Sequence, residues 1–227
     1  MYKKRVEDDK PFEFVDHSKV SVEEKKEFEL FLTELRPDAA KELLQKFEDY
    51  QYALWEENQK VNLVSRKTLA QDYWINHFLD SILGTKHVSF SGKKVLDFGT
   101  GGGFPGIPIA LLFPSSEVFL LDSKQKKIKA LKIIAEKLDL KNCFTIVSRI
   151  EELAPTWFGS FDYIVSRSVK ITPEYVPVLF RLLKPEGKLV LYKSKILDDT
   201  EQFENKKIID ISHPKIGERK LVIIWEK

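Results

Sequence analysis

The sequence predicts an α/β fold built on a doubly wound, mostly parallel sheet of seven strands, with a C-terminal β-hairpin and an N-terminal helical appendage. Three observations support this prediction. From residue 93 onward, short apolar segments alternate with helical ones, which is typical of a parallel sheet with helices on both faces. A glycine-rich loop leads from the first apolar segment into an apolar helix. Before residue 92, apolar side chains recur at helical intervals instead.

Composition and periodicity divide the chain into three parts. Residues 1–20 are charged and lack periodicity, so we expect a poorly ordered arm. Residues 21–91 form the helical appendage, and residues 92–227 form the domain that carries the sheet. Charge is unevenly distributed, because residues 1–91 hold 14 Lys and Arg against 18 Asp and Glu, whereas residues 92–227 hold 23 against 17. The excess of positive charge therefore lies in the second part.

Helices are expected in order along the appendage. An apolar stripe from Phe28 to Leu35 indicates the first. Pro37 suits the first turn of a second helix, where its missing N–H has no intrahelical partner to lose. That helix repeats apolar residues from Leu43 to Trp55, and a third covers residues 74–83.

Strands and helices then alternate. Apolar segments rich in β-branched and aromatic residues predict strands at 94–98, 117–122, 143–148, 161–166 and 187–193. Between them the spacing predicts helices near 105–113, 125–138 and 173–183. The end of the chain differs, because the β-rich segments 207–212 and 219–225 are joined by turn residues and predict a hairpin.

The composition also excludes several classes of protein. A single cysteine, Cys143, excludes an internal disulfide and a cysteine-based zinc cluster, and no metal is expected. No apolar segment approaches the ~20 residues of a membrane span, and no apolar region follows the polar start of the chain. We therefore expect a cytoplasmic protein with no membrane partner.

The glycine-rich loop runs from Gly99 to Gly106 and follows the first predicted strand. Glycines allow the backbone to turn sharply there and to approach a ligand closely. Residues 101–106 also satisfy the dinucleotide pattern G-x-G-x-x-G, so an enzyme that uses nicotinamide or flavin is an alternative.

Two carboxylates accompany the loop, and the first of them favours S-adenosylmethionine over a dinucleotide. Asp97 precedes the first glycine, where it can face the cationic end of a methionine moiety but would repel a pyrophosphate. Asp122 ends the second strand and is placed to accept hydrogen bonds from ribose hydroxyls, which suits either ligand. The sequence thus predicts an adenosylmethionine site.

The loop resembles that of the ribosomal small subunit methyltransferase G family, also called glucose-inhibited division protein B. The stretch from Val95 to Pro108 carries the likeness, and its Phe-Pro-Gly-Ile-Pro extension is more specific than its glycines. Four further blocks agree with the family: Asn62-Leu63, His77 to Ser81, Leu120 to Ser123, and Ser166 to Ser168. The resemblance covers roughly residues 45–195. It implies a class I, Rossmann-like methyltransferase that modifies nitrogen-7 of a guanine in 16S ribosomal RNA, either free or within a small-subunit particle.

The same resemblance implies which residues bind the cofactor. Besides the two aspartates, Gly99 and Phe104 would line the cleft, and Ile150 with Glu151 would meet the adenine. The full set of expected cofactor residues is Asp97, Gly99, Thr100, Gly101, Gly103, Phe104, Asp122, Ser123, Ile150, Glu151 and Arg167. The chain departs from the family pattern in two places: Ile150 replaces a common alanine, and Ser168-Val169-Lys170 replaces an alanine-rich segment.

Arg167 and Lys193 are the expected catalytic residues. Both follow strands at their C-terminal ends, where α/β sheets bind ligands, and both can donate to a phosphate or to the acceptor oxygen of a base. Guanine nitrogen-7 already offers a lone pair, so the reaction needs alignment and electrostatics more than a general base. Cys143, which starts an apolar strand, is expected to be an inert buried thiol.

Other residues invite catalytic or RNA-binding roles, but packing explains them better. His77 and Asp80 share a helix face and are expected to make a structural hydrogen bond that joins the appendage to the sheet. Trp55, Trp74 and Trp157 are expected in the core or at junctions. The lysines between 124 and 132 are expected on a solvated helix face. A nicotinamide-dependent oxidoreductase, a methyltransferase for another RNA or a small molecule, and a catalytically silent RNA-binding module remain alternatives.

Overall fold

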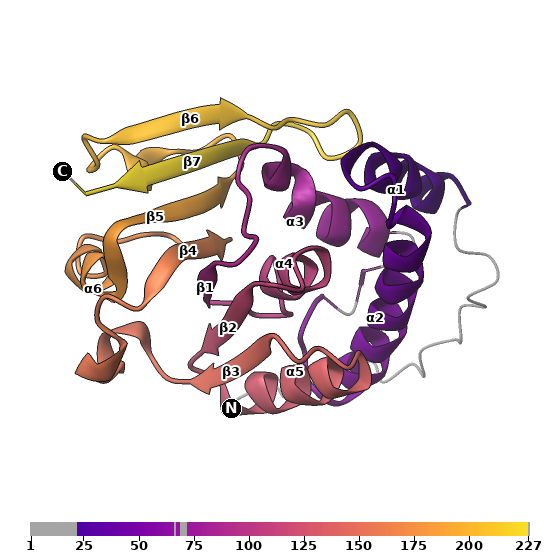
Figure 1. Cartoon of the computed structure of the whole chain (residues 1–227), viewed down its shortest axis with the longest axis horizontal. Helices are drawn as coiled ribbons and strands as arrows, with labels where there is room; N and C mark the ends of the chain where they lie inside the picture. The colour runs from indigo at the N-terminus through magenta and orange to yellow at the C-terminus, as the bar shows by residue number, and fades with distance from the viewer. Residues whose placement is uncertain (1–21, 66, 69–71, 227) are drawn as a thin grey trace, which may run out of the picture.

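The computed structural model describes residues 22–65, 67–68 and 72–226, so the predicted N-terminal arm lies outside the described residues. A seven-stranded sheet forms the centre of the molecule, with strand order β3-β2-β1-β4-β5-β7-β6. Strands β1 to β5 run parallel, and β7 pairs antiparallel with both β5 and β6. The predicted doubly wound sheet with a terminal hairpin is confirmed (Figure 1).

The strands lie close to their predicted positions. Their bounds are β1 Lys94–Phe98, β2 Glu117–Asp122, β3 Cys143–Val147, β4 Phe161–Arg167, β5 Leu183–Lys193, β6 Lys206–Asp210 and β7 Lys220–Trp225. Strand β5 begins four residues earlier than predicted, because Leu183 pairs with Phe161 before the register shifts to the pair of Tyr163 and Lys188. Pro185 and Gly187 lie within this irregularity.

Helices cover both faces of the sheet. The helices of the sheet domain are α4 Gly106–Leu112, α5 Gln125–Lys137 and α6 Val176–Leu182. Three short 3₁₀ turns accompany them: η4 Ile150–Glu152, η5 Pro155–Trp157 and η6 Asp198–Thr200. Val95 of β1 packs in one apolar core with α4 and α5, whereas its neighbour Leu96 packs in a second core with α6. This alternation along one strand is what a sheet buried on both faces requires.

The N-terminal helices are α1 Val22–Leu35, α2 Ala40–Lys60, the π-helix η2 Tyr73–Leu79, α3 Asp80–Ile82 and the 3₁₀ turn η3 Leu83–Lys86. The expectation that Pro37 lies in the first turn of the second helix is wrong. The N–H of Ala39 donates to the carbonyl of Arg36 at 3.0 Å, which closes a turn with Pro37 in its second position. Proline favours that position, and α2 begins only at Ala40.

The N-terminal helices share a core with the sheet. Phe28, Phe47 and Phe78 are fully buried, and they belong to the same apolar cluster as Val95 and Phe104 of the sheet domain. Figure 1 shows α1 and α2 alongside the layer that contains α4. None of the helices in the described part of the chain combines the length and the apolar composition needed to cross a membrane.

Candidate active site

The loops that follow β1, β2, β4 and β5 meet at the edge of the sheet where the parallel strands end. The glycine loop after β1 has three residues with positive φ: Gly99 at 70°, Gly101 at 56° and Gly103 at 93°. A Cβ atom on Gly99 would lie 2.5 Å from Val169, and one on Gly103 would lie 2.8 Å from the Tyr50 hydroxyl. Packing therefore demands glycine at these two positions.

Gly101 differs, because a side chain there would meet no crowding atom. The nearest atom to a Cβ built there is the Gly99 carbonyl oxygen at 3.8 Å. Asp122 lies next to it at the end of β2, and its Oδ2 accepts a 3.3 Å hydrogen bond from the Gly101 N–H. Asp122 Oδ1 accepts a second, at 2.8 Å, from the Lys124 N–H at the start of α5. A carboxylate thus stands beside the one loop glycine whose outer side is free to receive a ligand.

Asp97 is fully buried and holds the loop together from within. Its Oδ2 accepts hydrogen bonds from the Thr100 hydroxyl at 2.7 Å and from the Gly106 N–H at 2.8 Å. Its Oδ1 is buried without a hydrogen-bond partner among the described residues. Burial raises the pKa of Asp97 from 3.8 to about 6, against the lowering effect of the hydrogen bonds from Thr100 and Gly106. The carboxyl group therefore braces both ends of the loop.

The remaining expected cofactor residues lie at the same edge. Ser123 is exposed directly after β2, and η4 after β3 places Ile150 in the core and leaves Glu151 exposed. Phe104 is 5% exposed, and its ring stacks on His77 at 5.0 Å between centroids. Through this ring the glycine loop packs against the N-terminal helices.

Tyr50 supports the glycine loop from the N-terminal side. This fully buried residue of α2 donates a hydrogen bond from its hydroxyl to the Gly102 carbonyl at 3.1 Å. The same hydroxyl occupies the space beside Gly103, and the ring of Tyr50 packs on Phe104. The sequence identifies Tyr50 only as part of a helical stripe, because periodicity shows that a residue is buried but not what it contacts.

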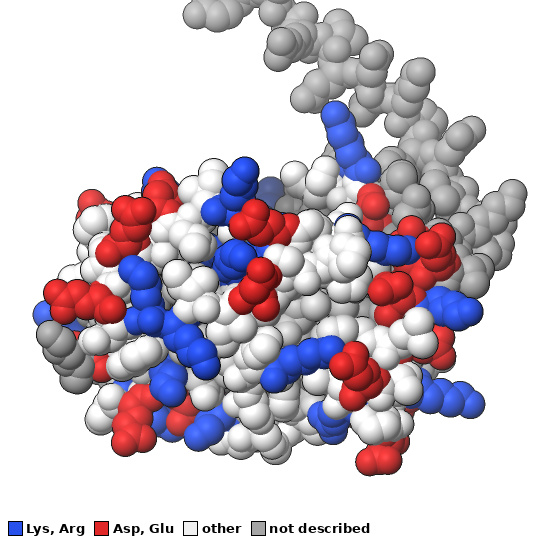
Figure 2. All heavy atoms as spheres, turned by 90° about the horizontal axis from the view of Figure 1, so that it is seen from above, with Lys and Arg blue, Asp and Glu red and all other residues white. Residues whose placement is uncertain are grey.

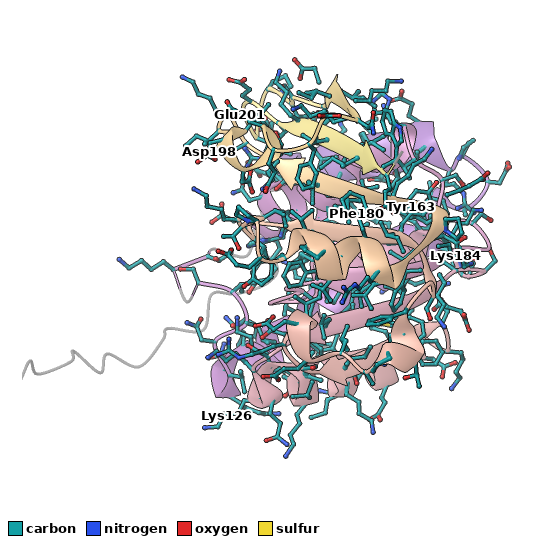
Figure 3. All side chains as sticks on the ribbon, turned by 90° about the vertical axis from the view of Figure 1, so that its left-hand side faces the viewer. Lys126, Tyr163, Phe180, Lys184, Asp198 and Glu201 are labelled. Atoms are coloured by element: carbon teal, nitrogen blue, oxygen red, sulfur yellow. The ribbon has the colours of Figure 1, made fainter. Side chains whose placement is uncertain are left out.

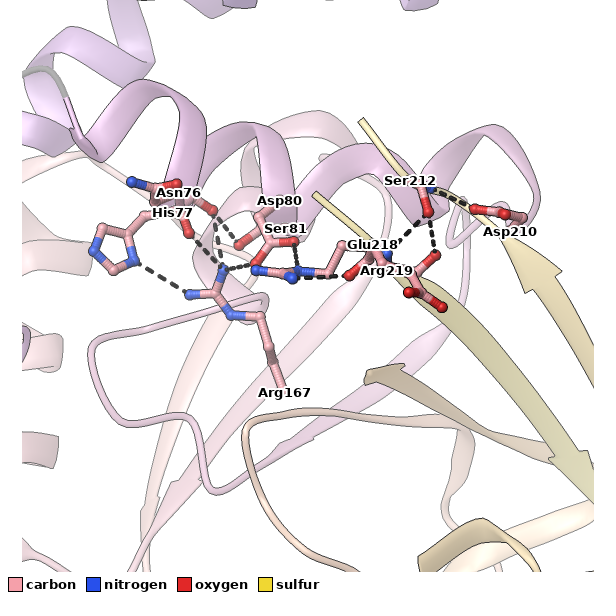
Figure 4. A network of polar contacts seen from close by, with 9 residues as sticks. All are labelled: Asn76, His77, Asp80, Ser81, Arg167, Asp210, Ser212, Glu218 and Arg219. Carbon is pink, nitrogen blue, oxygen red and sulfur yellow. Dashed lines mark hydrogen bonds and ion pairs between the residues drawn. The ribbon is translucent and has the colours of Figure 1, made fainter. Parts of the chain in front are cut away.

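Arg167 ends β4 and is docked on the N-terminal helices (Figure 4). Its Nη1 donates to Asp80 Oδ2 at 3.0 Å and, at 3.3 and 3.4 Å, to the carbonyls of Asn76 and His77. Its guanidinium also lies 5.0 Å from the Phe104 ring centroid. The other carboxylate oxygen of Asp80, Oδ1, accepts a hydrogen bond from Arg219 Nε at 2.8 Å. The predicted structural link from His77 and Asp80 to the sheet is confirmed. Arg167 of β4 is the residue that donates hydrogen bonds to them.

His77 is unsuited to accept a proton at neutral pH. Burial, followed by the charge of Arg167, lowers the pKa of His77 to about 4. Burial likewise raises the pKa of Cys143 to about 12, so this group remains a thiol, as the sequence predicts. Neither side chain offers a base or a nucleophile to the site.

Lys193 ends β5 and lies beside the same cavity as Arg167. The cavity has a volume of about 260 Å³, and its lining includes Arg167, Ser168, Lys193, Ser194 and Arg219. The Lys193 ammonium donates to Asp199 and, at 3.1 Å, to the Val169 carbonyl. The structure thus brings both expected catalytic residues to one cavity. Lys193 is 11% exposed and pairs with buried Asp199, and Arg167 is 13% exposed and pairs with buried Asp80. Sequence patterns identified neither Asp199 nor Arg219.

Several residues lie where packing was expected to put them. Trp74 is 1% exposed, and Trp157 stacks on Phe161 at 5.6 Å between ring centroids. The lysines of α5 are mostly exposed, and Figure 3 shows Lys126 pointing away from the body of the protein. Figure 2 shows acidic and basic side chains interspersed on the face with β6, β7 and α1, where Asp210 pairs with Lys220 at 2.9 Å. Among the described residues, no group of acidic, histidine or cysteine side chains is arranged to hold a metal ion.

Comparison with known proteins gives consistent matches. The sequence profile of the family described as rRNA small subunit methyltransferase G matches residues 43–219. Ribosomal RNA small subunit methyltransferase G of Mesoplasma florum is 40% identical over 171 residues, covering 75% of this chain and 71% of that protein. The protein of the same name from Christiangramia forsetii is 36% identical over 184 residues, covering 78% of this chain and 85% of the other.

Solved structures share the fold at lower identity. A SAM dependent methyltransferase from Aquifex aeolicus superposes with a TM-score of 0.53 at 18% identity, covering 67% of this chain and 93% of that one. The tRNA (m1A58) methyltransferase of the same organism also gives a TM-score of 0.53 at 18% identity, covering 65% of this chain and 68% of that one. These two likenesses support the class I, Rossmann-like architecture of the sheet domain.

Proposed function

The chain belongs to the rRNA small subunit methyltransferase G family, and we propose that it methylates nitrogen-7 of a guanine in 16S ribosomal RNA. As a member of this family it is a methyltransferase that uses S-adenosylmethionine and acts on ribosomal RNA. The specific atom and the guanine are the proposal. We also propose the cytoplasmic location expected from the sequence, since small ribosomal subunits of bacterial type are assembled there.

The cofactor half of this reaction is supported by the open side of Gly101 beside Asp122. Adenosylmethionine fits such a site, because the loop backbone can approach it closely and a carboxylate can accept hydrogen bonds from its ribose hydroxyls. Ser123, Ile150 and Glu151 follow the neighbouring strands and would hold the adenosine portion. When bound, the cofactor supplies a methyl group activated by its sulfonium.

The acceptor base would enter the cavity between Arg167 and Lys193. Both cations line it at the ends of β4 and β5, and each can donate to the carbonyl oxygen of guanine or to a phosphate. Nitrogen-7 needs no deprotonation, and this suits a site whose histidine, His77, stays neutral. The residues of the chain therefore act by alignment and charge.

Family membership removes the oxidoreductase alternative. The glycine loop, Asp122 and Arg167 are intact, which argues against a silent RNA-binding module. A thermal-shift comparison tests both points, because a ligand that binds only the folded state raises its melting temperature. We expect adenosylmethionine and its demethylated product to raise it, and NAD to leave it unchanged.

The decisive experiment uses cofactor labelled in the methyl group. RNA and intact small subunits from cells that lack this protein are each incubated with the enzyme, and the labelled nucleoside is identified and mapped. We expect 7-methylguanosine in 16S RNA, and the better of the two preparations identifies the natural substrate. Label on another base, in protein or in small molecules would contradict the proposal.

A further inference from the structure

We propose that Asp199 is a positioning residue for methyl transfer, which fixes the Lys193 ammonium in the wall of the acceptor cavity. The inference rests on the proposed function and assigns a role to a residue outside both the glycine loop and the family motifs quoted above. Asp199 lies in η6, directly after β5, and its side chain is 3% exposed. A carboxylate so deeply buried needs a charged partner, and Lys193 is that partner.

Asp199 joins three segments at one point. Its Oδ2 accepts a hydrogen bond from Lys193 at the end of β5 and a second, at 2.7 Å, from the Ile171 N–H in the loop after β4. Lys193 in turn donates to the Val169 carbonyl of that loop at 3.1 Å. The carboxylate therefore fixes the ammonium relative to both strands that border the cavity.

This arrangement leaves Lys193 able to bind a ligand. An ammonium group has three N–H donors, and two of them are used on Asp199 and Val169 among the described residues. The third remains for an acceptor in the cavity that Lys193 lines. A lysine side chain is ordinarily flexible, so two fixed hydrogen bonds hold the third donor in one place.

Stability alone does not account for the pair. A buried ion pair seldom stabilises a fold more than well-packed apolar residues would, because both charges lose their hydration. The segment has a second connection as well, since Gln202 Nε2 donates to the carbonyls of Ile171 at 2.9 Å and Asp199 at 2.7 Å. These bonds remain when the charge of Asp199 is removed, so an Asn variant should keep the fold of this segment.

The chain offers a matched control at the opposite edge of the sheet. Asp162 Oδ2 accepts a hydrogen bond from a backbone N–H, that of Lys94, at 2.8 Å, and one from a lysine ammonium, that of Lys184, at 2.7 Å. Figure 3 shows Lys184 on the side away from Asp198, the neighbour of Asp199. Asp162→Asn therefore makes the same chemical change far from the cavity.

The experiment measures methyl transfer to RNA at saturating cofactor for wild type, Asp199→Asn, Asp162→Asn, Lys193→Met and the double variant of residues 193 and 199. We expect Asp199→Asn to lower kcat about ten- to a hundred-fold, the effect of a misplaced reacting group. Cofactor affinity, measured by calorimetry, should change less than about twofold, and Asp162→Asn should match wild type. In the Lys193→Met background, Asp199→Asn should have no further effect, because Asp199 acts through Lys193.

Three results would overturn the inference. The first is wild-type kcat in Asp199→Asn, and the second is wild-type kcat in Lys193→Met, which remains informative even where the Asn variant folds poorly. The third is an equal loss of kcat on introducing Asp199→Asn into wild type and into Lys193→Met, because such a result indicates general disruption of the loop. Failure of the wild-type enzyme to label RNA at all would refute the proposed function instead, so the two failures are distinguishable.

Discussion

The two edges of the sheet carry the same chemistry in different surroundings. At the edge where the strands end, Asp199 and Lys193 are 3% and 11% exposed. At the edge where they begin, Asp162 and Lys184 make an equivalent pair but are 19% and 44% exposed. The type of contact is therefore no guide to the functional edge. What distinguishes the edge of the proposed site is the depth of burial of its charges, because burial of an ion pair is costly and seldom stabilises a fold.

The largest expected difference between the edges concerns Asp80. Asp80→Ala leaves the guanidiniums of Arg167 and Arg219, 13% and 27% exposed, without their shared carboxylate. We expect the free energy of unfolding to fall by about 3 kcal/mol or more, the usual effect of breaking a buried ion pair, and methyl transfer to be lost. Asp162→Ala should cost about 1 kcal/mol or less, because its lysine partner is half exposed. Denaturant titration of both variants measures the contrast, and equal losses would contradict it.

The contributions of Asp97 and Asp162, at the two edges, to the free energy of unfolding should change with pH in opposite directions. The raised pKa of Asp97, about 6 instead of 3.8, means that the folded state favours the neutral acid. Asp97 therefore contributes stability that is fully present below pH 3.8 and is lost as the pH rises through about 6, a change of about 3 kcal/mol. Relative to wild type, Asp97→Asn should become more stable across this window. A constant difference between the two proteins from pH 4 to 6 would show that Asp97 is not buried as described.

Asp162 provides the opposite slope. Partial burial raises the pKa of Asp162, but the hydrogen bonds from Lys184 and the Lys94 backbone outweigh this effect and hold the pKa below its usual value. Its contribution to stability is present above the unfolded pKa and is lost as the pH falls through the lowered folded value. Asp162→Asn should therefore gain on wild type as the medium becomes more acidic. If Asp162→Asn instead gains stability relative to wild type toward neutral pH, the pKa of Asp162 is raised and not lowered.

Asp122 provides a test of intermediate size for the cofactor side of the site. Asp122→Ala removes the carboxylate beside Gly101, so charge-assisted hydrogen bonds to the ribose would be lost. We expect a loss of about 1.5 to 3 kcal/mol, or roughly ten- to a hundred-fold in affinity for adenosylmethionine, with RNA binding unchanged. Calorimetry measures the first and filter binding the second. Undiminished cofactor affinity would remove Asp122 from the site.

The smallest effect separates the edges through two glycines. Gly101 and Gly92, which precedes β1 at the other edge, both have positive φ, and a Cβ atom at either position would meet no atom closer than 3.8 Å. Alanine at either position should cost about 1 to 2 kcal/mol in unfolding free energy, because both backbones are left-handed. Only Gly101→Ala should also weaken cofactor binding, by about tenfold or more. Equal cofactor affinity in the two variants would mean that the open side of Gly101 receives no ligand.

The sequence predicted the elements of the fold better than the contacts of the site. The alternation after residue 93 and the hairpin are visible because burial on a sheet imposes a period on neighbouring residues. The π-helix at 73–79 was predicted as an ordinary helix, since both repeat apolar residues at similar intervals. Arg219 and Asp80 are 139 residues apart, and no local pattern connects them. Arg167 and Lys193 were identified as cations at strand ends, and Asp80 as part of a link to the sheet. The pairing of Asp80 with Arg167, and the involvement of Asp199, became visible only in three dimensions.

The hydroxyl of Tyr50 has a consequence for how proteins of this architecture can be recombined. A chimera that joins residues 92–227 to helices from a different methyltransferase would replace both the group that holds the Gly102 carbonyl and the surface against which Phe104 packs. The glycine loop would then be grafted onto a partner with another shape. We therefore expect that the first helices and the loop can be exchanged only together, whereas insertions should be tolerated at exposed turns, such as the one that ends at Gly217 between β6 and β7.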